Sequence, residues 1–133
     1  MYIDIVIKFL KLIFFISIIS LIIISLYPGS IIGYLLYNDF GQQPKLIKNP
    51  FGTSINHFLS YFYVTCIGLY AYSESNHLQK LIYGLFFLSI ALEALQYIVP
   101  NRAFEIYDLA GNFLGVLVAC FLVKTYLTLK HHE

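Results

Sequence analysis

Three ionisable side chains lie in apolar parts of the sequence, where they could act on a ligand: His57, Glu93 and Asp108. An imidazole beside a carboxylate can form an acid–base pair, and partial burial can tune the carboxylate toward neutral pH. The same side chains offer one nitrogen and two oxygen ligands, a set that suits zinc or manganese. Because no short ligand spacing supports a metal site, we predict no metal and no cofactor.

Polar residues accompany these three side chains at helical spacing. Residues three or four positions apart share one helical face, and the pairs are His57 with Tyr61, Glu93 with Gln96, and Asp108 with Asn112. Arg102 lies between the last two pairs, and its guanidinium fork suits a phosphate or carboxylate. The predicted ligand-binding set is therefore His57, Tyr61, Glu93, Gln96, Arg102, Asp108 and Asn112, and His57, Glu93 and Asp108 are also the catalytic candidates.

The composition indicates a membrane protein. The chain is 59% hydrophobic and 11% charged, with a mean hydropathy of +0.77, whereas soluble domains are roughly 45–50% apolar and 25% charged. A net charge of +1 provides no basic field, which argues against nucleic-acid binding. Cys66 and Cys120 lie within apolar runs, so we expect them to fill the core as free thiols.

Four apolar segments predict an all-α bundle of four transmembrane helices, at about 9–36, 55–72, 81–99 and 107–129, in a single domain of residues 1–133. About 20 helical residues cross a hydrocarbon core, and the alternation of a barrel strand is missing. The first helix should bend or end near Pro28. The alternative for this segment is a cleaved signal peptide, since Lys8 and Lys11 precede it, but no small-x-small cleavage site follows.

The distribution of basic residues predicts the orientation of the chain in its membrane. One set of flanks holds Lys8, Lys11, Lys80, Lys124 and Lys130, and the other holds Lys45, Lys48 and Arg102. Basic residues favour the cytoplasmic side, so both termini are expected there. The seven ligand-binding candidates then share the outer leaflet.

Glu93 is the least expected of these residues. It precedes Pro100 by seven positions, which places it roughly 10 Å inside the end of its helix. A lone carboxylate at that depth costs several kcal/mol, so it should be paired, protonated or in contact with a wet cavity. Gln96 and Tyr97 share its face, which we expect to point away from lipid.

Gly111 and Gly115 form a small-xxx-small pair for close helix packing, within one chain or in a homodimer.

Several short motifs resemble those of the VanZ-like family of small bacterial membrane proteins. They are "INHFLSYF" at 55–62, "EALQ" at 93–96, "PNR" at 100–102 and "DLAGNFLG" at 108–115, with "SLYPG" at 25–29 as a further match. Their order and spacing resemble the family from about Ser54 to Gly115. One departure is that Thr53 and Ser54 stand where the family commonly has Asp-Lys shortly before the histidine.

The resemblance implies a cell-envelope setting and an association with resistance to teicoplanin, a glycopeptide with a lipid tail, but no particular reaction. From the residues, we expect binding of the head group of an anionic lipid or a lipid-linked envelope precursor at the outer interface. One alternative is a structural scaffold that docks a membrane protein partner. Another is an enzyme that acts on a lipid by histidine–carboxylate chemistry.

Overall fold

The described chain is entirely helical. A computed structural model describes residues 2–42 and 54–130, and it contains no strand there. The five helices are α1 Tyr2–Leu26, α2 Ile31–Tyr37, α3 Ser54–Ala71, α4 Leu78–Gln96 and α5 Ile106–Lys130. The all-α prediction is therefore confirmed.

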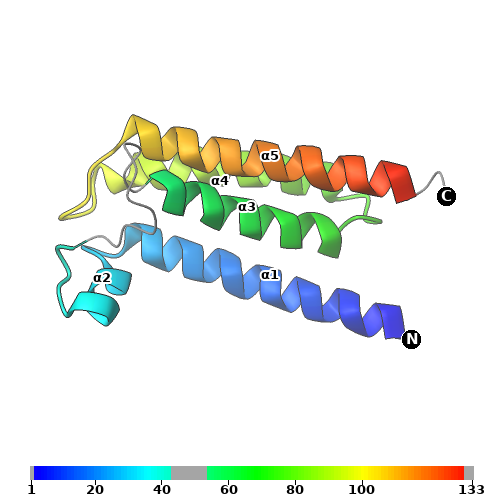
Figure 1. Ribbon diagram of the computed structural model, residues 1–133, viewed down its shortest axis with the longest axis horizontal. Helices are drawn as coiled ribbons and strands as arrows, with labels where there is room; N and C mark the ends of the chain where they lie inside the picture. The colour runs from blue at the N-terminus through cyan, green and yellow to red at the C-terminus, as the bar shows by residue number, and fades with distance from the viewer. Residues whose placement is uncertain (1, 43–53, 131–133) are drawn as a thin grey trace.

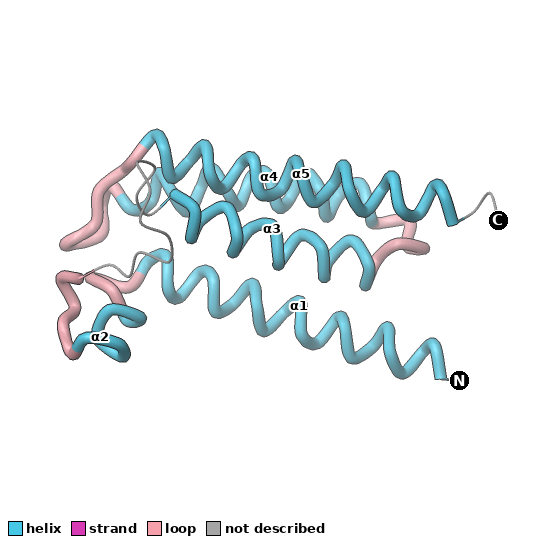
Figure 2. The backbone as a smooth tube through the Cα atoms, in the orientation of Figure 1, coloured by secondary structure: helices cyan, strands magenta, loops and turns pink. Residues whose placement is uncertain are grey.

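The four long helices lie side by side, and each runs antiparallel to the previous long helix (Figure 1). α3 has a central position, because it contacts α1, α4 and α5. The short α2 lies beside the C-terminal end of α1, at the same end of the bundle as the loop that joins α4 to α5 (Figure 2). This end also holds the first turn of α3.

Two helix boundaries differ from the prediction. The range 9–36 contains two helices, because the chain breaks after Leu26 at Pro28 and at Gly29, which has a positive φ of 90°. A Cβ atom on Gly29 would also lie 2.9 Å from the carbonyl oxygen of Phe40. α4 ends at Gln96, three residues before the predicted end at Val99.

Three of the described helices are long and apolar enough to cross a membrane, at Asp4–Leu26, Leu78–Gln96 and Ile106–Leu129. α3 is not one of these, because polar residues such as Asn56, His57 and Ser60 in its first turns lower its mean hydropathy. Bulky apolar side chains are exposed along α1, including Phe9, which is 61% exposed. Such a surface fits contact with lipid.

Glycine allows two close helix contacts inside the chain. A Cβ on Gly111 would lie 2.5 Å from the carbonyl oxygen of Ser54, and one on Gly115 would lie 2.5 Å from that of Phe58. The predicted Gly111–Gly115 groove therefore packs α5 against α3 of the same chain. On the other side of α3, the ring of Phe14 from α1 covers Gly68, where a Cβ would lie 2.7 Å from the ring.

Candidate functional site

The site begins with the carboxylate of Glu93, which is fully buried near the end of α4. Its Oε1 accepts a hydrogen bond from the backbone N–H of Glu105 at 3.1 Å, and its Oε2 accepts one from Nδ2 of Asn112 at 3.3 Å. The α4–α5 loop and the first turns of α5 thus satisfy the carboxylate. The prediction that Glu93 is paired and faces away from lipid agrees with this geometry.

The amide of Asn112 connects Glu93 to His57. Its Nδ2 group also donates to the carbonyl oxygen of Ser89 at 3.4 Å, so both amide protons point toward acceptors on α4. The amide oxygen therefore faces His57, whose Nδ1 lies 3.0 Å away. Because an amide oxygen only accepts, Nδ1 of His57 must carry the proton in this contact.

Asp108 holds the other side of the histidine. Its Oδ1 accepts a hydrogen bond from the hydroxyl of Ser54 at 2.8 Å, and its Oδ2 lies 3.4 Å from Nε2 of His57. Nδ1 of His57 is also 3.9 Å from Oε2 of Glu93. Oxygen atoms therefore face both ring nitrogens and hold the imidazole ring in place.

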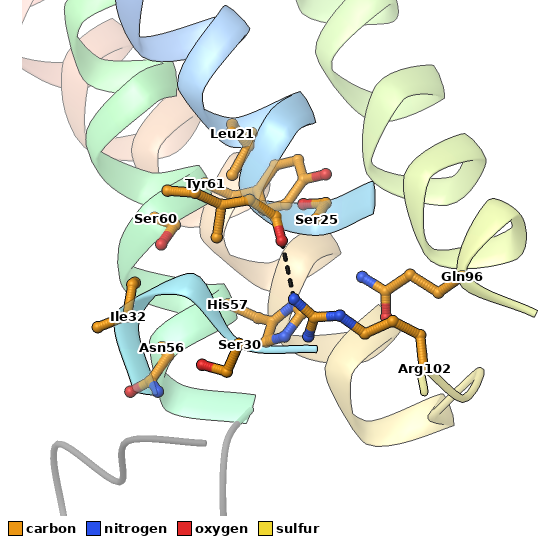
Figure 3. A pocket seen from close by; sticks show the side chains of 11 residues that line it. Leu21, Ser25, Ser30, Ile32, Asn56, His57, Ser60, Tyr61, Gln96 and Arg102 are labelled. Carbon is orange, nitrogen blue, oxygen red and sulfur yellow. Dashed lines mark hydrogen bonds between the residues drawn. The ribbon is translucent and has the colours of Figure 1, made fainter. Parts of the chain in front are cut away.

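A small pocket of about 80 Å³ lies in front of the histidine (Figure 3). Its walls come from α1, α2, α3, the end of α4 and the α4–α5 loop, and they consist of Leu21, Ile24, Ser25, Ser30, Ile32, Asn56, His57, Ser60, Tyr61, Gln96 and Arg102. Figure 3 shows the polar ends of His57, Gln96 and Arg102 close together. His57 thus belongs to both the pocket and the buried cluster.

Arg102 joins the loop to the end of α1. Its Nε donates a hydrogen bond to the carbonyl oxygen of Tyr27 at 3.2 Å, and a terminal guanidinium nitrogen donates to that of Ile24 at 2.8 Å. The last carbonyls of a helix have no partner within the helix, so Arg102 caps α1. Burial lowers the pKa of Arg102, and the negative charges of Glu93 and Asp108 oppose that shift. An arginine nevertheless stays charged in proteins.

The seven predicted residues fall into two adjoining groups. His57, Glu93, Asp108 and Asn112 form the buried cluster, while Tyr61, Gln96 and Arg102 line the pocket together with His57. Among the described residues, no group of three or more His, Cys, Asp or Glu has an arrangement that could hold a metal ion.

Two details of the prediction are wrong. Tyr97 does not share the buried face, because α4 ends at Gln96 and the Tyr97 side chain is 79% exposed. Glu93 is shallower than predicted, since it stands three residues from the helix end, which corresponds to roughly 4–5 Å of helix. Its contact with the loop backbone follows from this position.

Sequence reasoning missed four partners of the site. Ser54 was not among the predicted site residues, although its hydroxyl donates a hydrogen bond to Asp108. The carbonyl of Ser89 lies one turn before Glu93 on the same face, so helical spacing could have identified it. The backbone carbonyls of Ile24 and Tyr27 could not be identified from the sequence, because every residue has a backbone carbonyl.

Comparison with known proteins places the chain in a family. The model of the VanZ/LLP1 family matches residues 6–128. Because this match covers most of the chain, the chain belongs to the VanZ/LLP1 family. Family membership and the three apolar helices fit a membrane protein. No curated protein and no solved structure matches the chain.

Proposed function

We propose that the protein binds the anionic head group of a membrane lipid, or of a lipid-linked envelope precursor, in the pocket between His57 and Arg102. The observation that carries this proposal is the charge of the lining: it contains two basic side chains and no acidic one. Glu93 and Asp108 lie behind the histidine, where they hold it instead of facing a ligand. The pocket is therefore suited to an anion.

The size of the pocket limits what can enter it. An engineered cavity of about 150 Å³ can hold benzene, and this pocket has about 80 Å³. A phosphate or carboxylate group fits that space, whereas a sugar ring or a peptide would remain outside. The chemical class of the ligand is therefore an amphiphile with a small anionic group, whose remaining parts stay in the surrounding membrane.

Each polar group has a defined role in this proposal. Arg102 keeps donors for a ligand, because a guanidinium has five N–H groups and its bonds to the carbonyl oxygens of Ile24 and Tyr27 use only part of them. The contacts of His57 with Asp108 and Asn112 fix the ring orientation. The amide of Gln96 completes the polar wall.

The proposed membrane arrangement has four spanning helices, with α3 as the fourth. α3 contains 18 residues, which corresponds to about 27 Å, close to the roughly 30 Å of a hydrocarbon core. It packs against α1, α4 and α5, so its polar first turn is shielded by protein. With both termini in the cytoplasm of a bacterial cell, the pocket opens at the outer leaflet.

The test compares two lipids that differ only in the phosphate. Purified protein is titrated with phosphatidic acid or diacylglycerol of identical acyl chains, and native mass spectrometry records the lipid retained. We expect wild-type protein to retain phosphatidic acid selectively. Arg102→Gln should weaken this selectivity, because the phosphate at the pocket around His57 and Arg102 is held less tightly, while Lys124→Gln, which removes a charge at the other end of the bundle, should keep it.

A scaffold role is the second candidate, because Arg102 caps α1 and thereby connects the α4–α5 loop to the rest of the bundle. Under this alternative, Arg102→Gln would lower the thermal unfolding temperature and neither lipid would be preferred by the wild type. That result would contradict head-group binding. A normally folded Arg102→Gln protein with weakened phosphate selectivity would support head-group binding.

A further inference from the structure

A second cavity lies between α1 and α4, away from the pocket around His57 and Arg102. It measures about 490 Å³, within the range of roughly 300–1,000 Å³ that is usual for ligand sites. Most of its walls are apolar and come from the middle of both helices. The lining residues are Phe14, Phe15, Ile18, Tyr72, His77, Lys80, Leu81, Gly84, Leu85, Phe87 and Leu88.

The cavity exists because of how α1 is held. The ring of Phe14 packs on Gly68 of α3, where no Cβ would fit. α1 therefore lies close to α3 along that contact. On the α4 side, a Cβ on Gly84 would meet no atom within 4 Å. Gly68 thus allows α1 to pack closely on α3, while Gly84 leaves space between α4 and α1.

The polar groups of the cavity are confined to one end. His77 and Lys80 lie at the start of α4, and the lining contains no acidic residue. Lys11 of α1 is close to the same end, with its Nζ 4.8 Å from the centre of the Tyr72 ring. From Leu81 to Leu88 the groove follows seven steps of the helix, which corresponds to roughly 10 Å of apolar wall.

We infer that this groove, defined as the α1–α4 groove, binds an anionic phospholipid of the leaflet opposite to the first pocket. One acyl chain would lie against Gly84 and Leu88, and the phosphate would be next to Lys80. The basic entrance and the apolar interior match the two parts of such a lipid. A basic residue at a membrane surface is worth about 1 kcal/mol toward anionic lipid, which corresponds to about a fivefold preference.

The test uses phosphatidylglycerol and phosphatidylcholine with the same acyl chains. Each lipid is titrated into detergent-solubilised full-length protein, and native mass spectrometry counts the lipids retained. We expect the wild type to prefer phosphatidylglycerol. Lys80→Gln should reduce this preference about fivefold, while Lys124→Gln, at the same end of the bundle, should leave it unchanged.

A second variant tests the apolar part of the groove. Gly84→Phe adds a ring to open space, so folding should be retained and one bound lipid should be lost. Arg102→Gln, which lies at the opposite end of the bundle, should leave the effect of Lys80→Gln intact. Equal retention of both lipids by the wild type would overturn the inference. Unchanged lipid binding by Gly84→Phe would also overturn it. The same holds if Gly84→Phe converts a dimer to a monomer and still retains the lipid, because the groove would then be a contact between two copies of the chain.

Discussion

At the scale of single residues, Asn112 determines how the buried cluster is arranged. Its amide donates to α4 and accepts from α3, so it fixes which nitrogen of His57 carries a proton. The helical spacing predicted that Asp108 and Asn112 share a face. The depth of Glu93 in its helix predicted that its carboxylate is paired, protonated or in contact with a wet cavity. The spacing did not predict that the amide lies between Glu93 and His57, because that depends on the relative rotation of three helices.

We expect Asn112→Ala to destabilise the fold, because it leaves buried polar partners on Glu93 and His57 without their bond. An unsatisfied buried polar group costs about 1–3 kcal/mol. Thermal unfolding of the purified protein measures this loss. Thr125→Ala on the exposed part of the same helix removes only a local hydrogen bond and should change stability by less than about 0.5 kcal/mol. Equal effects of the two substitutions would contradict the role of Asn112.

At the scale of elements, two kinds of glycine position determine the packing of the helices. The sequence identified Gly111 and Gly115 as a packing groove, but the same spacing fits contacts within a chain and between chains. The structure resolves this through the backbone of α3, which lies against both glycines. The early end of α4 was missed because Tyr97, Ile98 and Val99 are as apolar as the helix before them.

The two kinds of glycine should respond differently to alanine. In Gly115→Ala, the new Cβ would lie 2.5 Å from a backbone oxygen of α3, so the helices must move apart and the unfolding temperature should fall. In Gly84→Ala, the Cβ enters open space, and alanine favours a helix by about 1 kcal/mol over glycine. That variant should be as stable as the wild type or more so. A thermal unfolding series on both proteins would contradict the packing if Gly115→Ala were neutral.

At the scale of the whole molecule, the alternating direction of the long helices places the α4–α5 loop at one end and the α3–α4 connection at the other (Figure 1). Composition alone predicted an all-helical membrane protein, because apolar segments of this length leave few alternatives. The short α2 was not predicted as a separate helix. Pro28 indicated a break, but not that a seven-residue helix follows it.

The proposed orientation predicts which loops are accessible from outside the cell. With Cys66 and Cys120 replaced by alanine, a single cysteine is introduced by Ala103→Cys in the α4–α5 loop or by Asn76→Cys before α4. A membrane-impermeant thiol reagent should label the first variant in intact cells, and the second only after permeabilisation. Labelling of Asn76→Cys in intact cells would contradict the proposed topology.

The central claim is that an anionic group binds in the pocket that His57 and Arg102 both line, and a double-mutant cycle tests it most directly. Phosphatidic acid binding is measured by native mass spectrometry for wild type, His57→Gln, Arg102→Gln and the double variant, each shown to be folded by thermal unfolding. Residues that share a ligand couple by at least about 0.5 kcal/mol. We therefore predict that the double variant loses less affinity than the sum of the single losses. Strictly additive losses, or no loss in either single variant, would contradict a shared site.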